Sequence, residues 1–377
     1  MSDDPTVPVP LDQVDPLERQ PDPPASRAIA RDVALGAIAF VAVLLLLLGA
    51  TRLLERGGVP SPSSSRGAAA PPATAVPPTN PTPALSPTAG ASDASGAPSG
   101  SPSVSAGVSL PPGDPVLVGA GDIGVCGASG AEDTAAMIDG IQGTVFTAGD
   151  NVYESGTARE YTECYVPSWG RHLARTRPAP GNHDWGTADL AGYFGYFGAA
   201  AQGPDGSSWY SYDLGTWHVI VLDSMCEKVG GCDAASPQGR WLAADLAASA
   251  ATCTLAIFHH PRFSSGEHGD LESMDGFWRP LYAAGVDVVV NGHDHDYERF
   301  APQDPDGAAD PARGIRQFIV GTGGAQLRGF PREASNSQMR VSNGYGVIKF
   351  TLHEGAYDWD FTVAKADFND RGQANCH

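Results

Sequence analysis

Gly292-His293-Asp294-His295-Asp296-Tyr297-Glu298-Arg299 is a dense run of polar side chains that follows the apolar stretch from Val286 to Val290. A short continuous apolar stretch of this kind is typical of a fully buried β-strand. Glycine allows the chain to turn sharply where the strand ends. We therefore expect residues 292–299 to leave a buried strand and to present their side chains at the edge of a sheet.

Four other segments of the same kind lie earlier in the chain. They are Gly121-Asp122, Gly149-Asp150-Asn151-Val152-Tyr153, Gly181-Asn182-His183-Asp184 and His259-His260-Pro261. Three of them follow predicted strands at residues 116–120, 145–148 and 255–258. Polar groups at the ends of buried strands build sites along one edge of an open α/β sheet. Carboxylate, amide, imidazole and phenol groups together suit a pair of metal ions.

A structural explanation exists for each segment alone, because Asn, Asp and Gly favour turns whatever their function. Five such segments in one domain favour a site. In this order they resemble the calcineurin-like metallophosphoesterase superfamily, and within it the purple acid phosphatases. The resemblance covers roughly residues 115–365. The spacing from Asp150 to Tyr153, the run at residues 292–299 and the turn Gly321-Thr322-Gly323-Gly324 favour the purple acid branch.

The resemblance implies a centre of two metal ions. The first, Fe(III) in the purple branch, would be bound by Asp122, Tyr153 and His295. The second, a divalent Zn, Fe or Mn ion, would be bound by Asn182, His259 and His293. Asp150 would bridge the two ions.

The resemblance also implies three residues with catalytic roles. His183 corresponds to a histidine that contacts the substrate, and Asp184 stands where an acidic residue usually steadies it. His268 resembles a further histidine that contacts phosphate. We expect His260 to be a neighbour of the site rather than a ligand. Plant-type members carry an N-terminal β-sandwich domain that this chain lacks, so substrate preferences linked to that domain are not transferred.

The order of elements predicts the fold. Helices are expected near residues 131–139, 159–173, 237–249 and 275–284, alternating with the strands above. Late strands are expected at residues 315–320, 346–352 and 357–363. Alternating strands and helices followed by a strand-rich end predict two packed mixed sheets flanked by helices. The resemblance implies the same α/β class, a four-layer α/β/β/α sandwich.

The N-terminal part predicts where this domain lies. Residues 33–50 are uninterrupted apolar residues, long enough for a helix to span a bilayer. We expect a disordered cytoplasmic tail (1–32), a transmembrane signal anchor (33–54), a disordered linker rich in Pro, Ser, Ala and Thr (55–112) and a catalytic domain (113–377). A cleaved signal peptide is the alternative to the anchor.

All six cysteines follow the linker. An even number confined to one domain favours disulfides in an oxidising compartment, and Cys226 is expected to pair with Cys232. We therefore predict a single-pass protein of the cell membrane whose catalytic domain is extracytoplasmic. The formal net charge of -20 disfavours a nucleic-acid-binding surface.

The predicted function is hydrolysis of phosphomonoesters by hydroxide that two metal ions activate. Two alternatives remain open at this point. One is a phosphodiesterase that acts on nucleotides or phospholipid headgroups with the same site. The other is a catalytically inactive surface protein that binds a ligand. The sequence leaves the oligomeric state unknown.

Overall fold

The computed structural model describes residues 113–377. The predicted tail, signal anchor and linker, residues 1–112, lie outside the described residues. Within residues 113–377, no helix combines the length and the apolar character needed to cross a membrane.

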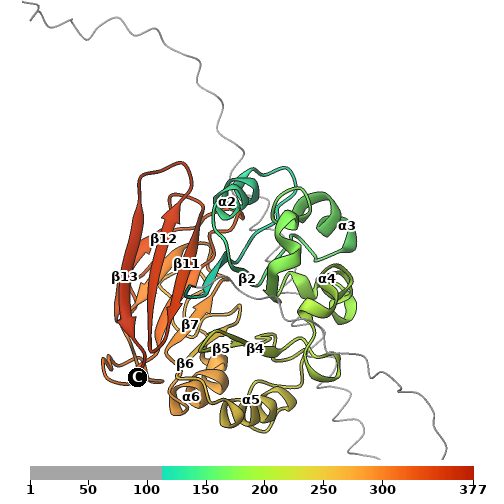
Figure 1. The fold of residues 1–377 in the computed structure, drawn as a ribbon. Coiled ribbons are helices and arrows are strands. Elements are labelled where there is room, and N and C mark those ends of the chain that lie inside the picture. Colours follow the sequence, from blue (N-terminus) through green and yellow to red (C-terminus); the bar gives the residue numbers. More distant parts are fainter. Residues whose placement is uncertain (1–112) are drawn as a thin grey trace, which may run out of the picture. The chain divides into compact units, whose positions relative to one another are not determined.

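The strands of this domain form two mixed sheets (Figure 1). The six-stranded sheet has the order β13-β12-β11-β1-β2-β3. Strands β1, β2 and β3 are parallel, and β11, β12 and β13 continue the sheet in antiparallel pairs. Its strands are β1 (Val116–Ala120), β2 (Thr144–Ala148), β3 (Thr176–Ala179), β11 (Gly346–His353), β12 (Ala356–Val363) and β13 (Asn369–Asn375).

The seven-stranded sheet has the order β10-β8-β9-β7-β6-β5-β4. Four neighbouring strands, β5, β6, β7 and β9, are parallel, and the outer strands pair antiparallel. Its strands are β4 (Tyr210–Leu214), β5 (Trp217–Val221), β6 (Cys253–Ile257), β7 (Val288–Asn291), β8 (Tyr297–Phe300), β9 (Arg316–Val320) and β10 (Ser337–Val341).

The seven-stranded sheet is buried on both faces, which explains its continuous apolar strands. Val219 and Val221 of β5 face the core shared with the six-stranded sheet, whereas Ile220 faces a second core. Helices α5 (Pro237–Ala248) and α6 (Asp275–Ala283) cover that second core. Both lie beside β4, β5 and β6 at the bottom of the view in Figure 1.

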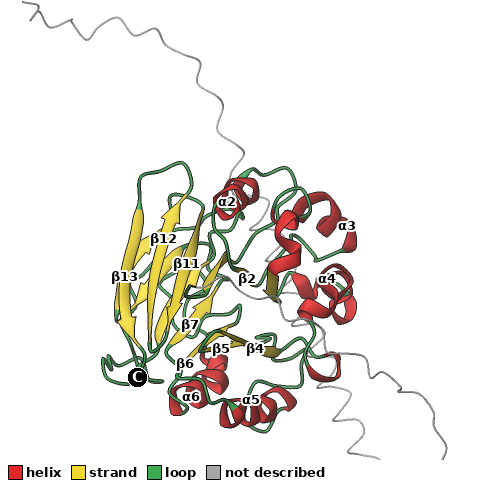
Figure 2. Cartoon of the chain, in the orientation of Figure 1, coloured by secondary structure: helices red, strands yellow, loops and turns green. Residues whose placement is uncertain are grey.

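Most of the remaining helical segments connect the strands of the first half of the domain (Figure 2). The α-helices among them are α2 (Gly130–Asp139), α3 (Ala158–Glu160) and α4 (Ala191–Phe197). A π-helix covers Tyr161–Tyr165, and 3₁₀ turns cover Trp169–Arg175, Asp184–Gly186, Ala188–Leu190, Gly198–Ala201, Pro204–Gly206 and Glu272–Met274. Helix α2 packs its buried alanines and Ile138 on the core beside β11.

Residues 159–173 are mostly helical, as expected, but they do not form one regular helix. The chain there is a short α-helix, a π-helix and a 3₁₀-helix in succession. Two side chains of the π-helix account for the break: Cys164 is bonded to Cys126, and Tyr161 reaches the carboxylate of Asp184. The other predicted helices occur within about two residues of their expected ends, as is usual for helix boundaries.

The six cysteines form three disulfides, so the expected pairing of Cys226 with Cys232 is confirmed. Cys126 pairs with Cys164. Cys253 pairs with Cys376 and thereby links β6 of one sheet to the segment that follows β13 of the other.

Candidate metal centre

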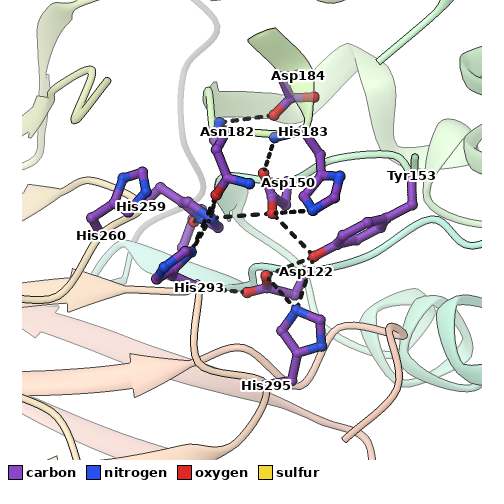
Figure 3. A network of polar contacts seen from close by, with 12 residues as sticks. Asp122, Asp150, Tyr153, Asn182, His183, Asp184, His259, His260, His293 and His295 are labelled. Atoms are coloured by element: carbon purple, nitrogen blue, oxygen red, sulfur yellow. Dashed lines mark hydrogen bonds and ion pairs between the residues drawn. The ribbon is translucent and has the colours of Figure 1, made fainter. Parts of the chain in front are cut away.

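The predicted ligands follow the carboxyl ends of parallel strands from both sheets. Asp122 follows β1, Asp150 follows β2, Asn182 follows β3, His259 follows β6 and His293 follows β7. Figure 3 shows their side chains converging on one point. This is the edge at which open α/β sheets bind ligands.

Glycines let the ligands approach one another closely. A Cβ atom at Gly149 would lie 2.5 Å from His259 Nδ1, and one at Gly181 would lie 2.2 Å from Asp150 Oδ1. Three ligands that follow a glycine have positive φ: Asp122 (60°), Asp150 (47°) and His293 (73°). Positive φ is uncommon for residues other than glycine and costs conformational energy. The backbone is therefore strained at these three positions.

Four side chains form what we call the first donor set: Asp122, Asp150, Tyr153 and His295. The Tyr153 hydroxyl lies 2.8 Å from Asp122 Oδ1, 3.2 Å from Asp150 Oδ2 and 3.2 Å from His295 Nε2. His295 Nε2 lies 3.3 Å from Asp122 Oδ1. All four side chains are buried.

Four side chains form the second donor set: Asp150, Asn182, His259 and His293. Asn182 Oδ1 lies 3.1 Å from His259 Nε2 and 3.1 Å from His293 Nδ1. His259 Nε2 lies 3.2 Å from Asp150 Oδ2. Asp150 Oδ2 therefore belongs to both sets.

The protonation of these groups shows that the centre suits cations. His259 Nδ1 donates to the carbonyl oxygen of Ala148 (2.9 Å), and His295 Nδ1 donates to that of Gln326 (2.8 Å). When neutral, both rings therefore turn an unprotonated Nε2 toward oxygens that also carry lone pairs. Such a cluster needs a positive charge between its members, and ligand histidines usually donate their other N–H in this way.

In the metal-free protein, protons supply part of that charge. Burial alone would lower the pKa of His259, but the facing carboxylate of Asp150 outweighs it and raises the pKa to about 9. Burial and the neighbouring His259 hold the pKa of His293 well below its usual range. Burial and the two carboxylates raise the pKa of Tyr153 well above its usual range. Cations that bind here must displace protons.

His183 lies beside the shared oxygen. Its Nδ1 donates to the carbonyl oxygen of Glu154 (2.6 Å), which leaves Nε2 turned toward Asp150 Oδ2 at 3.9 Å. The backbone N–H of His183 donates to Asp150 Oδ1 (2.8 Å). The ring is partly exposed, so a ligand at the centre can reach Nε2.

Asp184 was expected to steady His183, but its hydrogen bonds go elsewhere. Its buried carboxylate accepts from the backbone N–H of Gly181 (2.9 Å), from Asn151 Nδ2 (3.0 Å) and from the hydroxyl of Tyr161 (2.5 Å). Burial, with a contribution from Asp150, raises the pKa of Asp184 to about 6. Asp184 thus fixes the backbone that carries Asn182, and the Glu154 carbonyl orients His183.

The other two histidines also have defined places. His268 is exposed, and its ring stacks on His293 with centroids 4.2 Å apart. His260 lies outside both donor sets, with Nδ1 2.7 Å from the Ser224 hydroxyl, as expected for a neighbour. Burial lowers the pKa of His260 to about 3.

The sequence interpretation missed Glu154 and Tyr161. Glu154 acts through its backbone carbonyl, which no side-chain pattern reveals, whereas Tyr161 lies within a segment expected to be an ordinary helix.

Comparisons with known proteins show what this chain resembles. The profile of the calcineurin-like phosphoesterases matches residues 116–297. Purple acid phosphatase 21 of Arabidopsis thaliana is 31% identical over 226 residues, 52% of this chain and 50% of that protein. Acid phosphatase A of Cryphonectria parasitica is 28% identical over 34% of this chain and 30% of that protein. The chain thus spans half or less of the length of these two relatives.

Solved structures show the same fold. The purple acid phosphatase PPD1 from yellow lupin (Lupinus luteus) seeds superposes with a TM-score of 0.56. It is 19% identical, over 69% of this chain and 53% of that one. GAP50, the anchor in the inner membrane complex of Plasmodium, superposes with a TM-score of 0.51 at 16% identity, over 70% of this chain and 89% of that one. At these identities the likeness concerns the fold alone.

Proposed function

We propose that this chain, whose residues 116–297 match the profile of the calcineurin-like phosphoesterases, hydrolyses phosphomonoesters with two bound metal ions. The observation that carries the proposal is the shared oxygen of the two donor sets. Asp150 Oδ2 lies 3.2 Å from the Tyr153 hydroxyl and 3.2 Å from His259 Nε2. A carboxylate in that position suits a pair of adjacent ions better than a single one.

The residues fit two ions of different character. Asp122, Tyr153 and His295 would hold the first with Asp150, and anionic oxygen ligands suit Fe(III). Asn182, His259 and His293 would hold the second with Asp150, and two imidazoles with one amide oxygen suit Zn, Fe or Mn in the divalent state. When bound, such a pair supplies an activated water near neutral pH and stabilises the charge of a transferring phosphoryl group.

His183 has a role that the chain itself defines. The Glu154 carbonyl fixes Nδ1 as a donor, so Nε2 is the ring nitrogen that faces the centre. Protonated Nε2 can donate to a phosphoryl oxygen or to the leaving alkoxide. We propose that His268, whose ring stacks on His293, contacts the same phosphate.

We also propose that the domain is exported and anchored in the cell membrane, and thus extracytoplasmic. Two observations support this proposal. All six cysteines of the chain are paired in disulfides, which persist in oxidising compartments. The apolar residues 33–50 are long enough to span a bilayer as a helix.

The test is a comparison of p-nitrophenyl phosphate with its bis-ester. The protein is loaded with Fe and Zn, and a chelated sample serves as the control. Metal-dependent preference for the monoester would support the proposal. Preference for the diester would replace it with a phosphodiesterase, and no turnover of either ester with both ions bound would contradict hydrolysis of simple esters.

A further inference from the structure

Arg328 lies beside the metal centre, in the segment that follows β9. Its backbone N–H donates to the carbonyl oxygen of His295 (3.0 Å), so the chain holds it next to the first donor set. Its guanidinium Nη1 donates to Nε2 of His268. The ring of His268 stacks on His293. Arg328 is therefore separated from the second donor set by a single imidazole.

The charge of Arg328 is weakly compensated. Its one ion-pair partner among residues 113–377 is Glu267, whose carboxylate lies 3.8 Å away and whose side chain is 55% exposed. Arg262 and Arg299, in contrast, each lie 2.7 Å from a carboxylate. An arginine has five N–H donors, and the contact with His268 uses one of them. The Arg328 side chain is 33% exposed and can therefore bind an anion from solution.

His268, which accepts the hydrogen bond from Arg328, is firmly held. The backbone N–H of His268 donates to the buried carboxylate of Asp294 (2.9 Å), which also accepts from the hydroxyl of Ser264. The neighbouring Ser265 N–H donates to Glu298 Oε2 (2.8 Å). These buried carboxylates fix the loop that carries His268, so the guanidinium is placed in advance of ligand binding.

We propose that Arg328 forms a second anion subsite, and that the chain prefers phosphate esters whose leaving group carries a carboxylate or a further phosphate. The inference rests on the proposed function, because the second anion can reach Arg328 only when the phosphate of the same molecule is bound at the metal centre. Guanidinium pairs with carboxylate and phosphate through two parallel hydrogen bonds, which a lysine cannot reproduce. Because the chain carries a formal net charge of -20, a local cation matters for such substrates.

Binding is measured first, by calorimetry on the metal-loaded full chain with two non-hydrolysable probes. Phosphonoacetate carries a second anion, and ethylphosphonate has a similar size without one. The wild type should bind phosphonoacetate more tightly. Arg328→Gln should weaken phosphonoacetate about tenfold, equivalent to about 1.4 kcal/mol, and change ethylphosphonate less than about twofold. The affinity of Arg328→Lys for phosphonoacetate should lie between those of the wild type and Arg328→Gln, because lysine keeps the charge but not the paired hydrogen bonds.

Arg279→Gln is the matched control, since it removes the same charge from an exposed position on α6 that pairs with Asp275 and Asp306. It should leave both affinities unchanged. Equal weakening of both probes by Arg328→Gln would mean that Arg328 only supports His268, and would overturn the subsite. Equal wild-type affinity for the two probes would overturn it as well.

Turnover separates this inference from the proposed function. The matched substrates are 3-phosphoglycerate and glycerol 3-phosphate, which differ by a carboxylate in place of a hydroxymethyl group. Arg328→Gln should lower kcat/KM about tenfold for 3-phosphoglycerate only, mainly through KM. Turnover of both substrates without preference would overturn the subsite and leave hydrolysis standing. Arg328-dependent binding without any turnover would support the subsite and contradict hydrolysis.

Discussion

Asp150 and His259 lie 109 positions apart in the chain, and Oδ2 of the first is 3.2 Å from Nε2 of the second. The same oxygen is 3.2 Å from the Tyr153 hydroxyl. One carboxylate therefore connects ligands that follow strands of both sheets. Any change to it affects both donor sets at once, which makes it the most informative position to alter.

Asp150→Asn should deplete both metal ions and lower turnover by more than about 100-fold, since even residues that only support metal ligands cost 10–100-fold when replaced. Metal analysis of the purified variant measures the first effect. Asp306→Asn, at an exposed carboxylate, is the control. Full activity of the Asp150 variant would show that the two-ion assignment is wrong.

Tyr153→Phe tests the iron assignment separately. The Fe-loaded wild type should absorb visible light through the Tyr153 phenolate, and the variant should be colourless. The metal-free protein should also be colourless, because the visible absorption needs Fe(III) bound to the phenolate oxygen. A colourless wild type that is fully active without iron would rule out Fe(III) at this position.

Asp184→Asn should destabilise the fold by about 2 kcal/mol and weaken metal binding. The reason is that its carboxylate accepts several buried hydrogen bonds, which an amide cannot all satisfy. Tyr161→Phe removes one of these bonds and should cost about 1 kcal/mol. Urea unfolding of the metal-free proteins measures both. If Asp184→Asn left stability and metal content at wild-type levels, its positioning role would be refuted.

His218 gives a pH-dependent prediction away from the metal centre. Its ring bonds Asp245 (2.8 Å) and Asp213 (2.9 Å), and the bond to Asp245 is the main cause that raises the pKa of His218 above its usual 6.5. A group whose pKa is higher in the folded state than in the unfolded state stabilises the fold. This stabilisation is complete at pH values below the unfolded-state pKa and is lost as the pH rises through the folded-state pKa. The difference in stability between the wild type and His218→Gln should therefore be larger at pH 5.5 than at pH 9.

This difference is measured by urea unfolding at both pH values. Other titrating groups are common to the two proteins and cancel. A difference that does not change with pH would mean that folding does not shift the pKa of His218.

The disulfides should contribute unequally. The Cys253–Cys376 bond spans 123 positions and the Cys226–Cys232 bond spans 6. Loop-closure entropy predicts losses of roughly 5 and 2 kcal/mol when each pair is replaced by serine. Denaturant unfolding of the two double variants compares them. Equal losses would show that the longer loop remains compact in the unfolded chain.

The strands that carry the ligands could be predicted because they are continuous apolar runs that end at glycine and polar residues. Strand β3 could not, since Thr176-Arg177-Pro178-Ala179 holds a proline, which is tolerated here because β3 is an edge strand. Strands β4 and β5 were also not among the strands expected from the sequence.

The contacts of the site, like the strands, include some that the sequence predicts and some that it does not. Most of the ligands carry a local signal, because four of them directly follow a glycine near the end of a strand: Asp122, Asp150, Asn182 and His293. The contact between Arg328 and His268 spans 60 positions and depends on how two loops meet. The Glu154 carbonyl beside His183 has no side-chain signal at all. Such contacts follow from tertiary structure rather than from spacing.

The most direct test of the central claim is the number of ions required for activity. Metal is removed with a chelator, defined equivalents of Fe and Zn are returned, and hydrolysis of p-nitrophenyl phosphate is followed at each step. We predict that activity rises until two equivalents are bound per chain and then remains constant. Full activity at one equivalent, or no activity at two, would contradict a phosphatase in which Asp150 joins two metal ions.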